Sequence, residues 1–489
     1  MQRTQAINVI RASARALALG HPASDLDPET AQNGDLERAL LADAQPFGGW
    51  NPTGPSTCSG SPSPGVRSIY CVAGEGSPSP RAGFLLAPDG CQSHVRHERA
   101  SPKRAQTASV QPWESRPLTP MPKGAPWYTR DAIAVRDMLA SSYLNVLLLC
   151  IPLGFAAWAL DWGAVPVFML NFLSLVPLAL LLGSVTEDLA LRFGDVVGGL
   201  LNATFGNVVE VILSLEALNK GLYTVVAASL LGSILSNLLL VMGCCFLLGG
   251  LRYRVQTFNA TANQATSSLL FLSCIGIIIP TASTTLAGDS AAAQDLNLRI
   301  SRGAAVVLLF IYCCYLAFQL HTHHDLFAPD GDGDEEPTLT LAASVTALAV
   351  ITACVAACSE FLTGAIEDFS LQTGLSQAFV GIIILPIAGN ACEHIVAVMV
   401  AMKGKMDLAL GVAIGSSIQI AIFAIPLAVI VGWVIGRPFS LDLDPFAVVA
   451  LTVGVVHANF VTSGAQSHWL MGLQLIATYL LIAVTFLYR

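Results

Sequence analysis

Long runs of apolar residues, separated by short polar segments, make up the chain from Ser142 to its C-terminal end. The hydrocarbon core of a bilayer is about 30 Å thick, so a spanning helix needs about 20 predominantly apolar residues. Eleven runs of about that length follow one another: 142–161, 164–186, 197–218, 222–250, 264–287, 302–321, 338–361, 375–402, 407–433, 444–463 and 468–488. The pattern therefore predicts an all-α polytopic membrane protein with about 11 transmembrane helices.

A repeat relates the two halves of this pattern. Gly206-Asn-Val-Val-Glu210 recurs as Gly389-Asn-Ala-Cys-Glu393 at an offset of 183 residues. The same ungapped register aligns Lys220-Gly221 with Lys403-Gly404 and Gly232-Ser233 with Gly415-Ser416. We interpret the chain as one N-terminal helix followed by two repeats of five helices each. Because five is odd, the second repeat enters the membrane from the opposite side, which is the inverted topology of many secondary transporters.

The boundaries of the expected parts follow from composition. Residues 1–126 contain 16 of the 26 prolines and no apolar run long enough to span, so we expect a disordered Pro/Ser/Gly-rich tail. The first transmembrane region covers 127–163, and the first five-helix repeat covers 164–324. An acidic loop at 325–337 precedes the second repeat at 338–489.

Positive charges give the expected orientation. Arg130, Arg136, Arg192, Arg252, Arg254, Lys403 and Lys405 share one side of the membrane in this topology, whereas Lys220 and Arg437 do not. The positive-inside rule then places the N-terminus and the acidic loop in the cytosol.

Overall composition excludes several classes of protein. Charged residues are 12% of the chain and hydrophobic residues 54%, whereas about a quarter of a soluble domain is charged. The acidic residues behind the net charge of −9 concentrate in the tail and the loop, and no nucleic-acid partner is indicated. The 12 cysteines have neither zinc-site nor disulfide-framework spacing, so we expect no cofactor.

The candidate site is the pair of intramembrane carboxylates, Glu210 and Glu393. A charged side chain inside a bilayer is a functional-site hypothesis by default. Asn207 and Asn390 stand three residues before these acids, so each amide and its carboxylate share a helix face. Two carboxylates with neutral oxygens suit a hard divalent cation such as Ca²⁺. Two protons would neutralise the same pair, which makes H⁺ the expected counter-substrate.

Further residues are candidates around this pair. His394 could relay protons, and Gly206, Gly389 and Pro386 are expected to break the helices so that backbone oxygens reach the cavity. Neutral ligands are expected from Ser233, Ser416 and Gln419. Each of these residues also has a purely structural interpretation, in helix packing or interhelical hydrogen bonds.

Charged residues outside the predicted membrane core are weaker candidates. Glu187 and Glu360 at helix ends could form a vestibule for the cation, although interfacial solvation explains them equally well. The acidic loop could bind Ca²⁺ as a regulatory patch, or it could be a solvated linker. Its acidic residues are Asp330, Asp332, Asp334, Glu335 and Glu336.

The motifs resemble a known family, the Ca²⁺/H⁺ antiporters of the cation/proton exchanger (CAX) type within the Ca²⁺/cation antiporter superfamily. The segments 198–210 and 385–394 look like its two signatures, and Glu393-His394 after Gly389-Asn390 is typical of this branch. The resemblance covers about residues 130–489. It implies that Glu210 and Glu393 carry cation and proton, close to Asn207, Asn390, His394, Ser416 and Gln419. It also implies a vacuolar membrane and movement of cytosolic Ca²⁺ into the store.

Three alternatives remain open at this point. The same fold could carry Mn²⁺ or another cation as its main cargo. An intramembrane metallo-hydrolase could use Glu393-His394, but no His-Glu-x-x-His spacing occurs, so we expect no enzyme. A passive channel is the third alternative. Stoichiometry, affinity and oligomeric state do not follow from the sequence.

Overall fold

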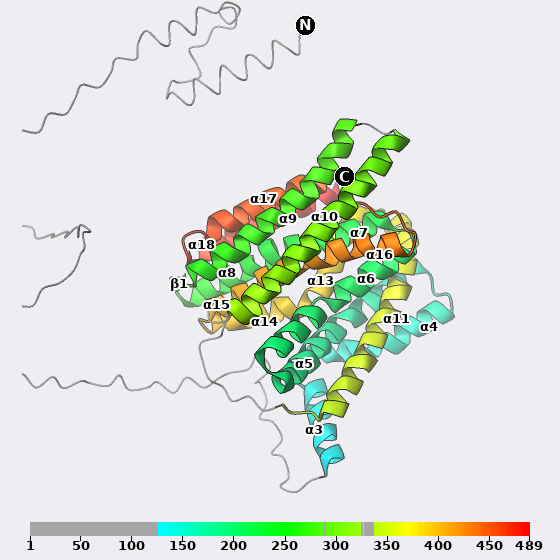
Figure 1. Ribbon diagram of the computed structural model, residues 1–489. Coiled ribbons are helices and arrows are strands. Elements are labelled where there is room, and N and C mark those ends of the chain that lie inside the picture. Colours follow the sequence, from blue (N-terminus) through cyan, green and yellow to red (C-terminus); the bar gives the residue numbers. More distant parts are fainter. Residues whose placement is uncertain (1–125, 288–289, 324–325, 327–336) are drawn as a thin grey trace, which may run out of the picture. The chain divides into compact units, whose positions relative to one another are not determined.

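The structure is a computed structural model that describes residues 126–489 except 288–289, 324–325 and 327–336. The predicted tail up to residue 125 and the acidic residues of the loop lie outside these described residues. Almost all of the described chain is helical (Figure 1).

Up to the acidic segment the described elements are α3 (Trp127–Ala140), η3 (Tyr143–Leu149), α4 (Cys150–Ala159), α5 (Ala164–Phe205), α6 (Val208–Asn219), α7 (Tyr223–Leu235), η4 (Ser236–Val241), α8 (Met242–Arg252), β1 (Gln256–Thr257), α9 (Ala260–Ala287), α10 (Ala291–Ala317) and η5 (Phe318–Thr322). After that segment they are α11 (Leu341–Thr373), α12 (Gln377–Phe379), η7 (Val380–Ile384), α13 (Leu385–Gly389), α14 (Ala391–Met402), α15 (Met406–Gln419), η8 (Ile420–Ala424), α16 (Ile425–Val434), α17 (Pro445–Thr462), β2 (Gln466–Ser467) and α18 (Trp469–Leu487).

Most of the predicted spans correspond to helices that could cross a membrane. Among the described residues eight helices are long and apolar enough, and up to ten if each of two bent helix pairs is one span. These ten correspond to all of the predicted runs except 197–218. The count of eleven therefore stays a prediction.

The predicted span at 197–218 is divided in the structure. A Cβ on Gly198 would lie 2.5 Å from the Ala190 carbonyl oxygen, although residues eight apart in a straight helix are about 12 Å apart. Helix α5 therefore bends back sharply near this point. The chain then breaks again at Gly206 and Asn207, and α6 continues for only 12 residues. Apolar composition alone does not reveal either break.

The elements of the two halves match in the register of the sequence repeat. Adding 183 to the bounds of α6, 208 and 219, gives 391 and 402, which are the bounds of α14. Two π-helical segments correspond to within one residue in this register, because η4 covers 236–241 and η8 covers 420–424. Each π segment follows the helix that carries a Gly-Ser pair, α7 or α15. π-Helical turns are rare and frequently mark functional sites.

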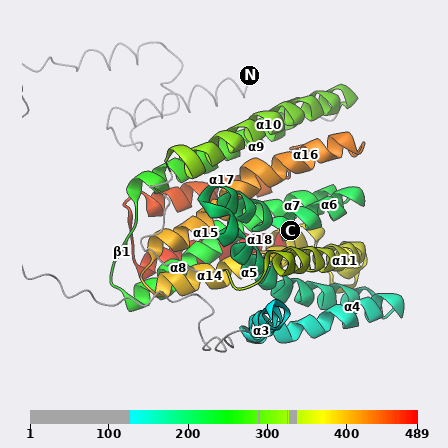
Figure 2. The same cartoon turned by 60° about the horizontal axis from the view of Figure 1, so that its bottom comes forward.

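Helix α11 belongs to the second half of the sequence but packs among helices of the first half (Figure 2). It contacts α5 along much of its length, and it also contacts α4 and α6. The rings of Phe168 on α5 and Phe369 on α11 stack with their centroids 4.0 Å apart. The two halves are therefore interlocked.

The beginning of α11 is held by two buried carboxylates. Asp188 on α5 accepts hydrogen bonds from the Thr338 backbone N–H (2.6 Å), the Thr338 hydroxyl (2.7 Å) and the Ser344 hydroxyl (3.0 Å). Asp131 on α3 accepts from the Thr340 backbone N–H (2.8 Å) and the Thr340 hydroxyl (2.6 Å). The chain that enters the second half is thereby fixed to α3 and α5.

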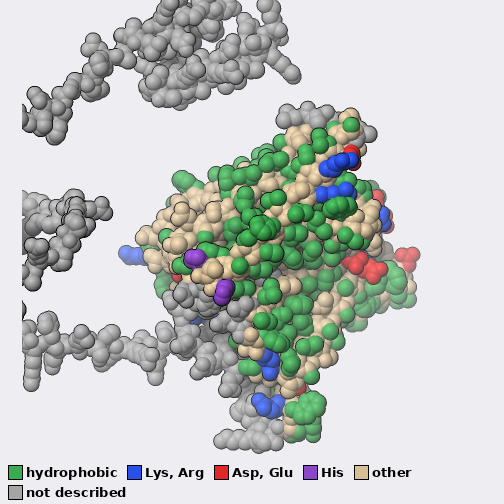
Figure 3. Space-filling model, viewed as in Figure 1, with side chains coloured by type: hydrophobic (Ala, Val, Ile, Leu, Met, Phe, Trp, Pro, Cys, Tyr) green, Lys and Arg blue, Asp and Glu red, His purple; other side chains and the backbone are tan. Residues whose placement is uncertain are grey.

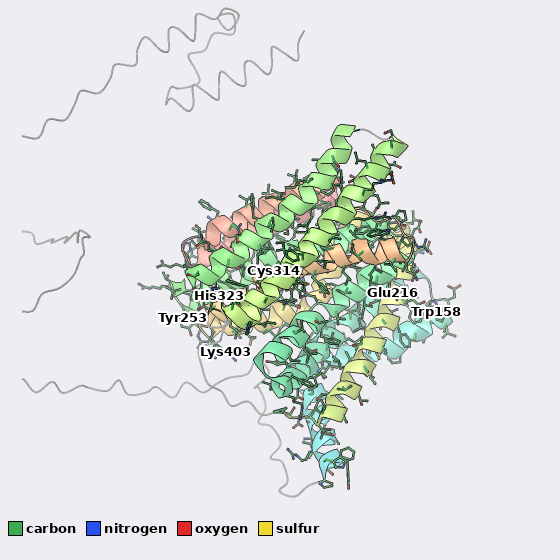
Figure 4. The ribbon with its side chains drawn as sticks, viewed as in Figure 1. Trp158, Glu216, Tyr253, Cys314, His323 and Lys403 are labelled. Carbon is green, nitrogen blue, oxygen red and sulfur yellow. The ribbon has the colours of Figure 1, made fainter. Side chains whose placement is uncertain are left out.

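Small residues allow several helices to approach closely. A Cβ on Gly472 of α18 would lie 2.4 Å from the Gly243 carbonyl oxygen of α8, so only glycine fits at this crossing. At the end of the bundle where α8 stops, β1 pairs antiparallel with β2, with Gln256 opposite Ser467. Figure 4 shows Tyr253, Lys403 and His323 toward this end of the bundle, and Glu216 and Trp158 toward the opposite one.

Candidate functional site

The site forms where the chain breaks between α5 and α6 and between α13 and α14. The second break bends the helical axis by 58°. Asn207 and Asn390 precede the first residues of α6 and α14, and neither side chain caps its own helix. Both amides are therefore available to other partners.

Each break places a carboxylate in the first turn of the helix that follows it. Glu210 lies in the first turn of α6, and Glu393 lies in the first turn of α14. The amino-terminal end of a helix carries a partial positive charge, which favours a carboxylate there. Each Glu therefore receives some electrostatic support inside an apolar bundle.

The structure brings the two predicted acids together. A Cβ on Gly389 would lie 2.6 Å from Glu210 Oε1, so this carboxyl group lies directly against the second break. Glu393 is close enough to interact electrostatically with Glu210. Glu210 is 5% exposed, and Gly389 beside it is buried; Pro386, in the first turn of α13, is buried as well.

A chain of side-chain hydrogen bonds joins the first break to α15. Asn207 donates through Nδ2 to Gln419 Oε1, and its Oδ1 accepts from the Ser416 hydroxyl at 2.6 Å. Ser416 Oγ also accepts from Asn237 Nδ2 at 2.9 Å. Both functional atoms of the Asn207 amide are therefore occupied by groups of the other half.

The corresponding amide of the second half is bound differently. Asn390 Nδ2 donates to the backbone carbonyl of Ser233 at 3.1 Å, and Asn390 Oδ1 has no hydrogen-bond partner among the described residues. The two halves thus have the same residues in the same register, but only Asn390 has a free oxygen.

Several buried oxygens at the site lack a partner. Among the described residues, no hydrogen bond is made by Glu210 Oε1 and Oε2, Glu393 Oε2, Asn390 Oδ1 or Asn237 Oδ1. Buried polar atoms without a partner are uncommon and costly. A cation that accepts six to eight oxygen ligands would satisfy them, which is typical of Ca²⁺.

The chemical nature of these groups indicates which class of metal ion the site would bind. Among the described residues no cluster of three or more His, Cys, Asp and Glu side chains could hold a metal ion. The site therefore offers two carboxylates and neutral amide oxygens. That ligand set favours a hard cation over a transition metal.

Glu187 lies near the site, next to Cys392, which was not among the predicted site residues. The Cys392 thiol is within electrostatic reach of the carboxyl groups of Glu393, Glu187 and Glu210. A Cβ on Gly183, one helical turn before Glu187, would lie 2.8 Å from Cys392 Sγ. Glu187 is exposed on α5. Cys392 lies between the repeat residues Asn390 and Glu393, but its own repeat counterpart is Val209, so the repeat did not single it out.

Glu360 does not lie with the carboxyl groups of Glu210 and Glu393. Its backbone carbonyl accepts a hydrogen bond from Lys220 Nζ, at the end of α6 farthest from Glu210. Burial lowers the pKa of Lys220, and the carboxylates of Glu360 and Glu216 oppose that shift. Glu360 therefore pairs with the α6–α7 turn and does not gather with the other site residues.

His394 is half-buried and follows Glu393 on α14. Among the described residues its ring makes no hydrogen bond to either carboxyl group of the site. Asn237 has no amide counterpart in the repeat, because the corresponding position is Ile420.

Comparison with known protein sequences finds one matching family and related ion transporters. The sequence model of the family described as "Sodium/calcium exchanger protein" matches residues 163–321 and 343–488. The chain is 43% identical over 356 residues to the vacuolar calcium ion transporter of Schizosaccharomyces pombe, covering 72% of this chain and 86% of that protein. It is 44% identical over 370 residues to the Ca(2+)/H(+) antiporter of Synechocystis sp., covering 71% and 98%.

Solved structures show the same relationship. The structure of native YfkE superposes with a TM-score of 0.62 at 33% sequence identity and covers 71% of this chain and all (100%) of that one. The crystal structure of the H+/Ca2+ exchanger CAX has a TM-score of 0.55 at 13% identity, which shows a similar fold.

Proposed function

Since the chain belongs to the sodium/calcium exchanger protein family, we propose that it is a secondary antiporter that exchanges Ca²⁺ for H⁺ across a vacuolar membrane. The observation that carries this proposal is the pair of carboxylates, the buried Glu210 and the half-buried Glu393, with unpartnered oxygens beside the Asn390 break. By name, the Schizosaccharomyces pombe relative is a vacuolar calcium ion transporter and the Synechocystis relative is a Ca(2+)/H(+) antiporter, which supports this proposal.

The carboxylates account for the coupling of the two ions. Leaving two negative charges unneutralised inside an apolar bundle is costly, whereas one Ca²⁺ or two protons remove the charge. The site therefore exchanges one occupant for the other. Asn390 Oδ1 and Asn237 Oδ1 would complete the cation's oxygen shell together with water.

Two equivalent positions in the repeat support alternating access. A Cβ on Gly232 of α7 would lie 2.3 Å from the Ile382 carbonyl oxygen, so α7 is closed tightly on η7. In the register of 183 residues, the counterpart of Gly232 is Gly415, and the counterpart of Ile382 is Gly199. A Cβ on Gly415 would have no atom within 4 Å, and one on Gly199 would meet Leu320 instead.

We infer that the two halves are related by inverted topology and that their equivalent contacts lie on opposite sides of the site. In this conformation the contact made by Gly232 closes the site toward the side where α6 ends and α7 begins. The equivalent contact of Gly415 is open toward the side where α14 ends and α15 begins. With the N-terminus cytosolic, the open side is the cytosolic one. Transport would interchange the two contacts.

A hollow of about 280 Å³ lies beyond the closed contact. Ala228, Leu231 and Ile382 line it together with Asp442 and Asp444. We propose that the cation leaves through this hollow once α7 separates from η7.

The test is Ca²⁺ flux in vesicles that contain the purified protein and an imposed pH gradient. We expect radioactive Ca²⁺ to accumulate against its own gradient until a protonophore removes the pH difference. Flux that ignores the pH gradient, or single-channel current in a planar bilayer, would contradict an antiporter. Adding Mn²⁺ or another divalent cation as competitor decides whether Ca²⁺ is the main cargo.

A further inference from the structure

Helix α3 runs across the direction of the first candidate span. The axis of Trp127–Ala140 makes an angle of 98° with the axis of Tyr143–Ala159. If the latter segment crosses a bilayer, α3 lies along the membrane surface. Figure 1 shows α3 projecting from the bundle beside the first turns of α11.

One face of α3 is apolar and unpartnered. Asp131 and Ala134 are buried against the protein. Next to them runs a stripe of exposed apolar residues at helical spacing, Tyr128, Ala132, Val135 and Leu139. Tyr128 is 61% exposed and Leu139 is 44% exposed. A short helix with such a stripe is typical of segments that lie in the membrane interface.

Two arginine side chains line a hollow beside this stripe. A cavity of about 330 Å³ is lined by Arg130 of α3, Arg192 of α5, Trp127 and Thr338. Neither guanidinium forms an ion pair with a described residue. Asp131 also lines the hollow, but both of its carboxylate oxygens are bound by Thr340. Figure 3 shows Lys and Arg side chains beside apolar ones on this part of the surface.

We propose that α3 is an interfacial helix that docks on an anionic membrane surface, with its apolar stripe among the lipids and Arg130 and Arg192 on the phosphate and carboxylate groups of one anionic headgroup. Guanidinium groups bind such oxyanions in a bidentate way, and a tryptophan at the rim suits the headgroup region. Because Asp131 also holds Thr340, docking positions the beginning of α11. The proposal does not depend on which cation is transported.

The test is hydrogen exchange of the amides in residues 127–140, measured by mass spectrometry on the full chain in vesicles. One set of vesicles is pure phosphatidylcholine, and the other contains about one third phosphatidylserine. We expect slower exchange in the second set. An arginine near an anionic surface changes the equilibrium constant for membrane docking by about fivefold. In the Arg130→Gln/Arg192→Gln variant, the slowing of exchange by phosphatidylserine should therefore be about 25-fold smaller.

The matched control is Arg252→Gln/Arg254→Gln, which removes two exposed arginines at the end of α8 and in the loop after it. It should keep the full effect of phosphatidylserine on α3. Equal exchange in both sets of vesicles would overturn the proposal. So would equal slowing by inorganic phosphate in detergent, which indicates a site for free anions. Slowing that grows with protein density in pure phosphatidylcholine would show contact between copies and would also overturn it.

Discussion

The carboxyl group of Glu210 lies against the backbone of Gly389, on the opposite half of the sequence repeat. The distance from Oε1 to the position of a Cβ on that glycine is 2.6 Å, shorter than any normal contact. The glycine is therefore needed for space, and not only to weaken the helix before Asn390. It lets an acid of the first half reach the break of the second half.

Replacing Gly389 by Ala should weaken Ca²⁺ binding. The added methyl group must displace the Glu210 carboxylate or the backbone, and overpacking of this kind costs about 1 to 3 kcal/mol. If that cost falls on the bound state, the apparent affinity for Ca²⁺ drops by about 5- to 150-fold. The apparent affinity is obtained from the rate of uptake at varied Ca²⁺ concentration. Gly411→Ala, where a Cβ meets nothing within 4 Å, is the control and should behave as the unaltered protein.

Glu210→Gln and Glu393→Gln should each abolish Ca²⁺ uptake driven by a pH gradient. The amide keeps the shape of the side chain but removes the charge that Ca²⁺ and H⁺ neutralise in turn. Glu216→Gln, on the same helix as Glu210, should retain uptake. Thermal unfolding in detergent checks that all three variants are folded. Normal uptake by either of the first two variants would rule out the mechanism.

The two asparagines should respond differently to substitution. Asn207→Ala leaves Ser416 and Gln419 without their partner, so we expect a loss of about 1 to 3 kcal/mol in the free energy of unfolding. Asn390→Ala removes a free oxygen and one donor to a backbone carbonyl, so its main effect should be on Ca²⁺ affinity. Melting temperatures with and without Ca²⁺ separate the two effects. The reverse assignment, with Asn207→Ala weakening only affinity, would contradict the described hydrogen bonds.

Gly415→Ala should leave the described conformation intact but slow transport. A methyl group fits there now, because a Cβ would have no atom within 4 Å. If the opposite state closes α15 as tightly as α7 is closed here, the methyl group would obstruct it. We expect unchanged thermal stability together with a reduced maximal rate of uptake. An unchanged rate would show that α15 never makes the contact that Gly232 makes.

Much of this site follows from the repeated motif. The register of 183 residues identifies Glu210 with Glu393 and Asn207 with Asn390, and the structure gives α6 and α14 the same bounds in that register. Intramembrane charge is so costly that the pair stands out without any knowledge of packing. Gly206 and Gly389 stand directly before the two asparagines at which the helices end, whereas Pro386 lies in the first turn of α13.

The differences between the halves could not be predicted in this way. A register treats Gly232 and Gly415 as equal, yet a Cβ on Gly232 would meet the Ile382 backbone and one on Gly415 would meet no atom within 4 Å, a difference that depends on packing in three dimensions. The predicted span at 197–218 is divided for a similar reason. Residues there are apolar enough for a span, and the bend near Gly198 depends on its contact with Ala190 in three dimensions.

The position of helix α11 bears on how the chain is assembled during synthesis. Its closest neighbour is α5, so the first half of the translation product emerges without the helix that covers that surface. Two fragments divided between α10 and α11 should each be unstable when produced alone and should recover Ca²⁺ transport when produced together. Recovery of this kind would show that the two halves of the sequence fold as one unit.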